Sequence, residues 1–245
     1  RPRPTLVSPG QAAAPVPPPS DAVVLFDGSG VGAWRSRNGG PAGWVVRDGA
    51  MEAVPGAGYV YTRQAFGDVQ LHVEWAAPTP PQGEGQDRGN SGVFLMGEYE
   101  LQVLDSYQND TYPDGQAGAA YGQYPPLVNA SLPPGAWQSY DIVFRRPRFD
   151  SAGAVLAPAR MTAFQNDVLI HDNVPLWGPT EWLQAGRYVA DSGRGPIALQ
   201  DHGNPVRYRN IWVRELPEGP PPIAPPPPAA VAVPASVLDA MVGRY

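Results

Sequence analysis

Between residues 21 and 216, short runs of alternating apolar and polar residues are separated by clusters of Gly, Pro, Asn and Asp. In residues 68–75, for example, every second residue is apolar, so an extended segment would have one apolar and one polar face. This alternation, bounded by turn-forming residues, predicts β-strands rather than helices. The predicted strands span residues 22–26, 43–47, 50–54, 58–65, 68–75, 91–96, 98–105, 137–144, 159–165, 167–171, 195–200 and 206–215. The pattern therefore predicts an all-β protein, built as a β-sandwich of two antiparallel sheets.

Two connections in this pattern carry further information. Asn166 and Asp167 separate two predicted strands, where a two-residue hairpin turn is expected. Residues 106–136, rich in Gly, Pro, Asn and Tyr, are too many for a simple turn. Connections of that length in a compact domain are usually functional or disordered.

Proline-rich segments flank the predicted sandwich. Residues 1–20 contain 7 prolines and residues 217–234 contain 9, half of the 32 in the chain. Such segments favour extended conformations and do not build a core. We therefore predict an N-terminal arm over 1–20, the sandwich over 21–216 and a linker over 217–234. Residues 235–245 have apolar residues at helical spacing, which predicts a short docking helix or, alternatively, the start of a truncated domain.

The composition argues against several classes of protein. A net charge of -6 and a pI near 5.0 disfavour a nucleic-acid partner, which would need a concentrated positive face. The chain has no cysteine, which excludes disulfides and a cysteine nucleophile. No apolar run approaches the roughly 20 residues of a transmembrane segment. Because the chain begins with Arg1 rather than Met, we predict a periplasmic or secreted protein whose signal peptide has been removed.

The most informative predicted strand is 98–105. Its apolar residues Tyr99, Leu101 and Val103 share one face and are expected in the core, which leaves Glu100 and Gln102 on the opposite face. Asp105 would join them only if a β-bulge shifts the alternation after Val103. Two carboxylates and an amide on one sheet face would suit acid–base chemistry on a polar substrate. The alternative is that Glu100 and Gln102 simply face water.

Other candidate groups lie in the predicted turns. Arg88, Asn90 and the adjacent glycines precede a predicted strand and could bring backbone amides close to a ligand, or form only a tight turn. His202 follows Asp201 at the end of another strand, where a carboxylate could fix the tautomer of a general base. His72 and His171 have weaker claims. The acidic residues near Glu100 and His202 could hold a divalent cation such as Ca²⁺, although no spacing demands one.

The sequence resembles a known family, the 3-keto-disaccharide hydrolases. The matching segments, in order, are LFDG (25–28), Trp34, GWVVRDG (43–49), FGDVQLHVEW (66–75), GNSGVFL (89–95), YELQVLDS (99–106), YGQ (121–123), VNAS (128–131), WQSYDIVF (137–144), HDN (171–173), GPT (178–180), GPIALQDHG (195–203) and VRYRNIWVR (206–214). Together they span nearly all of residues 22–216, and the tails lie outside them.

The resemblance implies a concanavalin A-like jelly-roll sandwich with its site on a concave sheet face. It places Glu100, Gln102 and Asp105 on the site strand. The surrounding residues would be Arg88, Asn90, Gln123, Asn129, Gln200, Asp201, His202 and Arg209. The strand is also similar to the Glu-x-Asp-x-x-Glu strand of related sandwich glycosidases, but Gln102 in the middle argues against a retaining mechanism with two carboxylates.

The family's substrate, a sugar oxidised at C3, implies a different route. The ketone acidifies the proton at C2, a base removes it, the C1 oxygen leaves by elimination, and water adds back. We expect His202 or Glu100 to be the base and Asp105 to be the acid that protonates the leaving oxygen. Arg88, Arg209 or a bound metal would stabilise the enediolate.

Two other classes of function fit the sequence. The chain could be a non-catalytic accessory subunit of a larger periplasmic or membrane-bound complex, such as a photosynthetic or respiratory assembly, held to protein partners by its proline-rich tails. It could also be a carbohydrate-binding module, in which Trp34, Trp177 and Trp182 stack on sugar rings. Fold alone does not choose among these functions.

Overall fold

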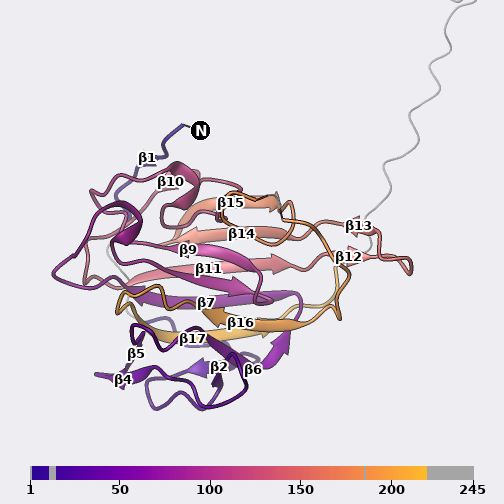
Figure 1. Cartoon of the computed structure of the whole chain (residues 1–245), viewed down its shortest axis with the longest axis horizontal. Coiled ribbons are helices and arrows are strands. Elements are labelled where there is room, and N and C mark those ends of the chain that lie inside the picture. Colours follow the sequence, from indigo (N-terminus) through magenta and orange to yellow (C-terminus); the bar gives the residue numbers. More distant parts are fainter. Residues whose placement is uncertain (1, 11–14, 185, 220–245) are drawn as a thin grey trace, which may run out of the picture.

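A computed structural model describes residues 2–10, 15–184 and 186–219 of the chain. Two antiparallel sheets stack face to face, and Figure 1 views them with β9 and β16 in front of β11 and β7. The eight-stranded sheet has the spatial order β15 (Val168–Pro175), β14 (Arg160–Gln165), β11 (Gln138–Arg145), β7 (Val69–Ala76), β17 (Arg207–Glu215), β5 (Ala50–Glu52) and β4 (Val45–Arg47), with β2 (Val23–Phe26) also paired to β17. The predicted two-sheet sandwich is confirmed.

The second sheet has five strands. Their order is β3 (Trp34–Ser36), β6 (Val60–Phe66), β16 (Gly195–Leu199), β8 (Ser91–Leu95) and β9 (Tyr99–Val103). The apolar faces of the two sheets meet in one core that includes the fully buried Trp75, Tyr99 and Tyr140. β11 shows why the chain folds this way, since buried and partly exposed residues alternate along its whole length. Burying one face of each strand supplies the hydrophobic free energy that joins the sheets.

The strands agree with the predicted ranges to within a few residues, and the hairpin turn is confirmed. Asn166 and Asp167 have φ angles of 52° and 64°, and Gln165 pairs with Val168 across them. Both residue types tolerate this left-handed conformation, which a two-residue hairpin turn requires. The structure adds strands that the alternation did not predict, because each is too short to show it: β1 (Thr5–Leu6), β3, β10 (Val128–Asn129), β12 (Arg148–Phe149) and β13 (Val155–Ala157).

The segment 106–136 is folded against the edge of the five-stranded sheet. Its backbone follows β9, because Gln102 N–H donates to Ala119 O at 2.9 Å and Gly118 N–H donates to Gln102 O at 2.9 Å. A one-turn 3₁₀ helix, η2 (Pro113–Gly115), lies within it, and another, η1 (Gly85–Asp87), precedes β8. The structure shows this long connection ordered along the edge strand β9.

The described part of the N-terminal arm lies on the sandwich. β1 pairs in parallel with β10, and further along the arm Val16 O accepts a hydrogen bond from Asn210 Nδ2 at 2.9 Å. The predicted arm, sandwich and linker boundaries stay predictions, and the predicted helix over 235–245 lies outside the described residues. None of the described segments forms a helix with the length and apolar character needed to cross a membrane.

Candidate active site

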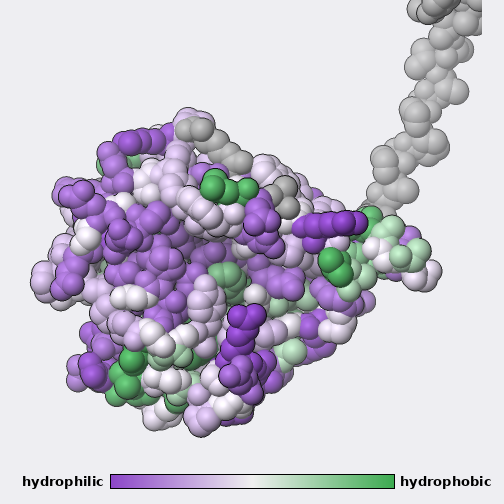
Figure 2. All heavy atoms as spheres, viewed as in Figure 1, coloured by the Kyte–Doolittle hydropathy of each residue, from purple (hydrophilic) through white to green (hydrophobic). Residues whose placement is uncertain are grey.

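A cavity of about 470 Å³ opens on the five-stranded sheet, on the face turned away from the core. Figure 2 views this face, and its central part is mainly hydrophilic. The cavity floor comes from β8, β9 and the end of β16, and its walls come from the segments around 112–121 and 180–182. The lining residues are Tyr59, Gln86, Asn90, Phe94, Glu100, Gln102, Tyr112, Tyr121, Thr180, Trp182, Gln200 and His202.

Glu100 is the carboxylic acid of the cavity floor. Its position on β9 follows from the predicted alternation, with Tyr99 and Leu101 in the core on the other face. The residue is only 5% exposed, and among the described residues none forms a hydrogen bond with its carboxyl group. Burial without a compensating partner disfavours the charged form and raises the pKa of Glu100 to about 8. The carboxyl group therefore holds its proton at neutral pH but can release it to a base or to solvent.

Gly92 makes room for this carboxyl group. Gly92 belongs to β8 and pairs with Gln102 on the adjacent strand β9, and the carboxyl group of Glu100 packs over Gly92. A Cβ atom at this position would overlap Glu100 Oε1 and would lie 2.9 Å from Phe94 Cε2. The glycine is thus required by the close approach of two cavity side chains, not by its own backbone conformation.

Two glutamines beside Glu100 have unpaired oxygen atoms. Gln102 Nε2 donates to Gly115 O at 3.2 Å, and Gln200 Nε2 donates to Tyr59 Oη at 2.6 Å. Within the described residues, the Oε1 atoms of Gln102 and Gln200 have no hydrogen-bond partner. Because the Tyr59 hydroxyl accepts the bond from Gln200, its own proton remains available. Burial raises the pKa of Tyr59, so this group is a neutral donor at the cavity.

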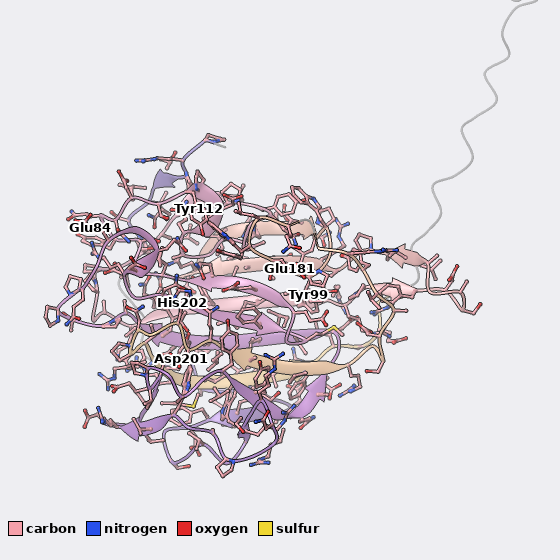
Figure 3. The ribbon with its side chains drawn as sticks, in the orientation of Figure 1. Glu84, Tyr99, Tyr112, Glu181, Asp201 and His202 are labelled. Atoms are coloured by element: carbon pink, nitrogen blue, oxygen red, sulfur yellow. The ribbon has the colours of Figure 1, made fainter. Side chains whose placement is uncertain are left out.

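An aromatic wall, which we define as Tyr112, Tyr121 and Trp182, closes one side of the cavity. The two tyrosine hydroxyl groups are hydrogen-bonded at 2.8 Å, and the Trp182 ring lies 5.4 Å from that of Tyr112. Thr180 holds the second segment against β9, since its Oγ1 accepts from Glu100 N–H at 2.9 Å and donates to Glu98 O at 3.0 Å. Figure 3 shows Tyr112, Glu181 and His202 over the sheet face turned to the viewer.

The predicted residues Asn90, Gln200 and His202 also lie at the cavity. Asn90 lines the cavity, and its Nδ2 donates to Gln86 O at 2.8 Å. His202 is exposed at the rim. Asp201 does not orient it, because both carboxylate oxygens accept backbone N–H groups, from Gly58 at 2.9 Å and from Gly203 at 2.9 Å. Asp201 therefore holds the turn together through these two backbone groups.

Arg88 and Asp105 are brought together, but beside the cavity rather than in it. β9 ends at Val103, so Asp105 lies beyond the strand and the bulge that would have aligned it with Glu100 does not form. Instead, Arg88 Nε donates to Asp105 Oδ2 at 2.7 Å and Arg88 Nη2 donates to Tyr107 O at 3.0 Å. This buried ion pair anchors the start of the 106–136 segment.

Three other predicted residues also have partners outside the cavity lining. Gln123 Nε2 donates to Gly178 O at 2.9 Å and Asn129 Nδ2 donates to Ser106 O at 3.0 Å, so both hold loops. Arg209 lies on β17 in the other sheet, where its Nε donates to Glu74 Oε2 at 2.6 Å. Its neighbour Tyr208 points into the core, so Arg209 points to the outside of the eight-stranded sheet.

The remaining histidines and Trp34 have structural surroundings. His72 is 2% exposed on the outside of the eight-stranded sheet, with Nδ1 2.8 Å from Asp141 Oδ1. His171 Nε2 donates to Gly118 O at 2.7 Å, and burial lowers its pKa to about 4, so the ring is neutral. Trp34 is fully buried and donates to Leu25 O at 2.9 Å. The interpretation of Trp34 as a sugar-stacking surface is therefore wrong, whereas Trp177 and Trp182 are about half exposed.

Sequence reasoning missed several lining residues. Phe94 lies in the predicted strand 91–96, Gln86 lies in the connection before it, and Tyr59 lies in the predicted strand 58–65, so alternation gave no sign that they converge. Tyr112 and Tyr121 lie in the long segment 106–136, which the sequence marked as unusual without assigning individual residues. In the part of the chain that the structure describes, no group of three or more His, Asp or Glu side chains is arranged to hold a metal ion.

Comparisons with known proteins identify the family of this chain. Residues 21–214 match the model of a family described as the 3-keto-alpha-glucoside-1,2-lyase-like domain. A 3-keto-disaccharide hydrolase of Bacteroides thetaiotaomicron is 25% identical over 79% of this chain and 78% of its own length. A crystal structure from Parabacteroides distasonis, provisionally described as a glycosyl hydrolase, is 44% identical with a TM-score of 0.79, covering 88% of this chain and 93% of that one.

A second Parabacteroides distasonis structure with the same description has 20% identity and a TM-score of 0.60, covering 80% of this chain and 94% of that one, which shows the shared fold. The architecture and its polar cavity define the class: an antiparallel β-sandwich with a ligand-sized site on one sheet. Within that class, the chain belongs to the 3-keto-alpha-glucoside-1,2-lyase-like family, as its sequence segments indicated.

Proposed function

We propose that this protein cleaves the glycosidic bond of 3-keto glycosides by proton abstraction at C2, elimination and hydration. The observation that carries the proposal is Glu100, a buried carboxyl group without a described partner on the floor of a cavity large enough for a sugar ring. Its pKa of about 8 lies close to neutral pH, where a group that first takes and then returns a proton is most effective. Family membership and the name of the Bacteroides relative supply the substrate class.

In the first step, Glu100 in its carboxylate form takes the C2 proton. The electron pair of the C–H bond moves toward the C3 carbonyl, so negative charge develops on the C3 oxygen. We assign the Tyr59 hydroxyl as the hydrogen-bond donor that stabilises this oxygen. This hydroxyl accepts a bond from Gln200, so its own proton is free to be donated. Arg88 and Arg209, expected earlier in this role, are bound to Asp105 and Glu74.

In the second step, the enediolate expels the C1 oxygen, which leaves as an alcohol after taking a proton. His202 at the rim is the proton carrier we assign to this oxygen, in place of Asp105, whose carboxylate is bound by Arg88. Water then adds across the C1–C2 double bond: His202 takes a proton from the water as its hydroxyl bonds to C1, and Glu100, whose proton has meanwhile exchanged with solvent, delivers a proton to C2. The sum of the steps is a hydrolysis in which the C2 hydrogen has been exchanged with solvent.

That exchange is the test. A 3-keto disaccharide is incubated with the protein in D₂O, and the 3-keto sugar released is analysed by mass spectrometry against a sample of the same sugar kept in D₂O without protein. We expect one deuterium at C2 above this control, and loss of both cleavage and exchange in Glu100→Gln. Cleavage that retains hydrogen at C2 would refute the elimination route, and absence of cleavage by the wild-type protein would refute the function.

The accessory-subunit and binding-module hypotheses remain the alternatives to catalysis. The described part of the N-terminal arm contacts this chain's own sandwich through β1 and Val16. These contacts account for that part of the arm without a second protein. Purification from membrane and soluble fractions tests both the exported location and the predicted protein partners of the tails. Fixed stoichiometry with a large complex, together with an inactive wild-type protein, would favour the accessory subunit. Sugar binding without turnover would favour the binding module.

A further inference from the structure

A second cavity of about 490 Å³ adjoins the first one on the same face of the molecule. Tyr112 and Trp182 line both cavities, so the aromatic wall separates an inner cavity that contains Glu100 from an outer one. Trp177 and Leu183 also line the outer cavity. A ligand bound at Glu100 and longer than one ring would extend past Trp182 into this space.

The outer cavity presents an unusual amount of exposed apolar surface. Trp182 is 55% exposed, Trp177 is 48% exposed and Leu183 is 82% exposed, all within one short segment. Leu183 has a φ of 54°, a left-handed conformation that is unfavourable for a non-glycine residue, and the Glu181–Gln184 bridge closes the turn around it. Exposed indole rings grouped beside a cavity are typical of surfaces that bind a ring by stacking.

Contacts among its own rings hold the aromatic wall in place. The Tyr112 ring lies directly over Gly115, where any Cβ would overlap the ring, and its hydroxyl is bonded to that of Tyr121. The ring planes of Tyr121 and Trp182 are inclined by only 26° at a centroid distance of 6.3 Å. Little side-chain entropy is therefore lost when a ring packs on this wall.

The charge of the outer cavity limits what can bind there. Asp114 and Glu181 line it, and none of its lining residues is basic. Glu181 is exposed, and Figure 3 places it on the same face as Tyr112. The exposed Glu181 carboxylate would repel an acidic ring and tolerate a neutral one.

We propose that the outer cavity binds the leaving group of the substrate, and that its preferred occupant is a neutral ring with one flat apolar face. The substrate is then a 3-keto glycoside whose C1 oxygen carries such a ring, stacked on Trp182, while the oxidised sugar occupies the inner cavity. This inference rests on the proposed function for the identity of the sugar, but the ring selectivity of Trp182 can be measured separately.

The experiment compares methyl and benzyl 3-keto glucosides of one anomeric configuration. Methanol and benzyl alcohol leave with similar intrinsic ease, so the comparison reports mainly on binding of the ring. In Trp182→Ala we expect kcat/KM for the benzyl substrate to fall about tenfold more than for the methyl substrate. Trp182→Phe should retain most of the preference. Val189→Ala is the control, since Val189 is 74% exposed and lines neither cavity.

A charge test uses the 4-carboxybenzyl substrate. The wild-type protein should process it less well than the benzyl substrate, and Glu181→Gln should narrow that gap by roughly threefold. An equal loss of kcat/KM for methyl and benzyl substrates in Trp182→Ala would overturn the proposal. If the wild-type protein cleaves neither substrate, the proposed function fails, and calorimetric binding of unoxidised benzyl and methyl glucosides decides this inference. Tighter binding of the benzyl compound, lost in Trp182→Ala, would sustain it, whereas equal binding would overturn it.

Discussion

Substitution of Gly92 by alanine tests whether the position of the Glu100 carboxyl group is what matters in the cavity. The added Cβ would overlap Glu100 Oε1 and approach Glu100 Cδ to 3.0 Å and Phe94 Cε2 to 2.9 Å, all closer than ordinary contact. The backbone of Gly92 is not left-handed, so alanine brings no conformational strain there. The ends of two side chains must therefore move, while the β8–β9 pairing can stay in place.

We expect Gly92→Ala to displace the carboxyl group by about 1 Å, and a displacement of this size in a catalytic group lowers kcat/KM on the order of 100-fold. Thermal unfolding should change little, because flexible side-chain ends absorb the overlap. Gly32→Ala is the matched control, since a Cβ there would meet no atom within 4 Å. Activity is followed as release of 3-keto sugar, and stability by differential scanning calorimetry.

A second background separates displacement of Glu100 from damage to the rest of the cavity. Glu100→Asp shortens the side chain and withdraws the carboxyl group from Gly92. In this background Gly92→Ala should lower kcat/KM by less than about threefold, because the effects of residues in contact are not additive. Wild-type activity in Gly92→Ala, or an undiminished 100-fold loss in the Glu100→Asp background, would refute the reasoning.

Three further predictions follow from the buried ionisable groups. If Glu100 is the base, kcat/KM rises with pH through its pKa of about 8, and a profile that falls over this range would assign it the role of acid instead. The folded-state pKa of Glu100 lies above its ordinary value of 4.5, so its contribution to stability decreases as pH rises from 4.5 to about 8. Glu100→Gln should therefore stabilise the protein by about 3 kcal/mol at pH 7 but not at pH 4. Equal unfolding temperatures of the variant and the wild-type protein at pH 7 would contradict this. Burial acts to lower the pKa of His72, but its bonds to Asp141 and Glu74 outweigh this and raise it to about 9, so the stability it contributes is complete below pH 6.5 and is lost as pH rises through 9. His72→Gln should remove about 3 kcal/mol at pH 6 and much less at pH 10, and the same loss at both pH values in chemical denaturation would exclude a charged ring.

The floor of the cavity could be predicted from the sequence because it lies on regular strands. Alternation on β9 placed Tyr99, Leu101 and Val103 in the core, and therefore Glu100 and Gln102 on the other face, where the structure has them. The prediction for Asp105 was conditional on a bulge, and no local pattern reveals whether a strand ends or bulges at a given residue. The strand ends at Val103, so Asp105 takes part in a loop anchor.

The walls could not be predicted in the same way. Tyr112 and Tyr121 reach the cavity because the 106–136 segment follows β9 through backbone hydrogen bonds, and such bonds carry no side-chain signature. Arg209 shows the opposite difficulty. It belongs to a predicted strand, but strand order decides which sheet contains that strand and on which side of the sheet Arg209 lies. Sequence therefore gives the face of a strand more readily than the position of that face in the fold.

The contrast between His72 and Glu100 shows how the structure separates a structural ionisable group from a functional one. Both are nearly fully buried, and burial opposes the charged form of both. His72 lies among Asp141, Glu74 and Asn210, so its charge is compensated and the cluster ties neighbouring strands together. Glu100 has no such compensation within the described residues, and it faces a cavity.

An isolated unpaired atom would not be enough for this distinction, because Gln165 Oε1 is also buried and unpaired among the described residues, away from the cavity lining. What distinguishes Glu100 is that a titratable group, two unpaired amide oxygens and a space of ligand size occur together. Leaving a carboxyl group buried and unpaired costs stability, and Gly92 is required to make the arrangement possible at all. A cost of this kind is explained if the missing partner of Glu100 is the substrate, whose C2 proton is the one that the carboxylate is placed to take.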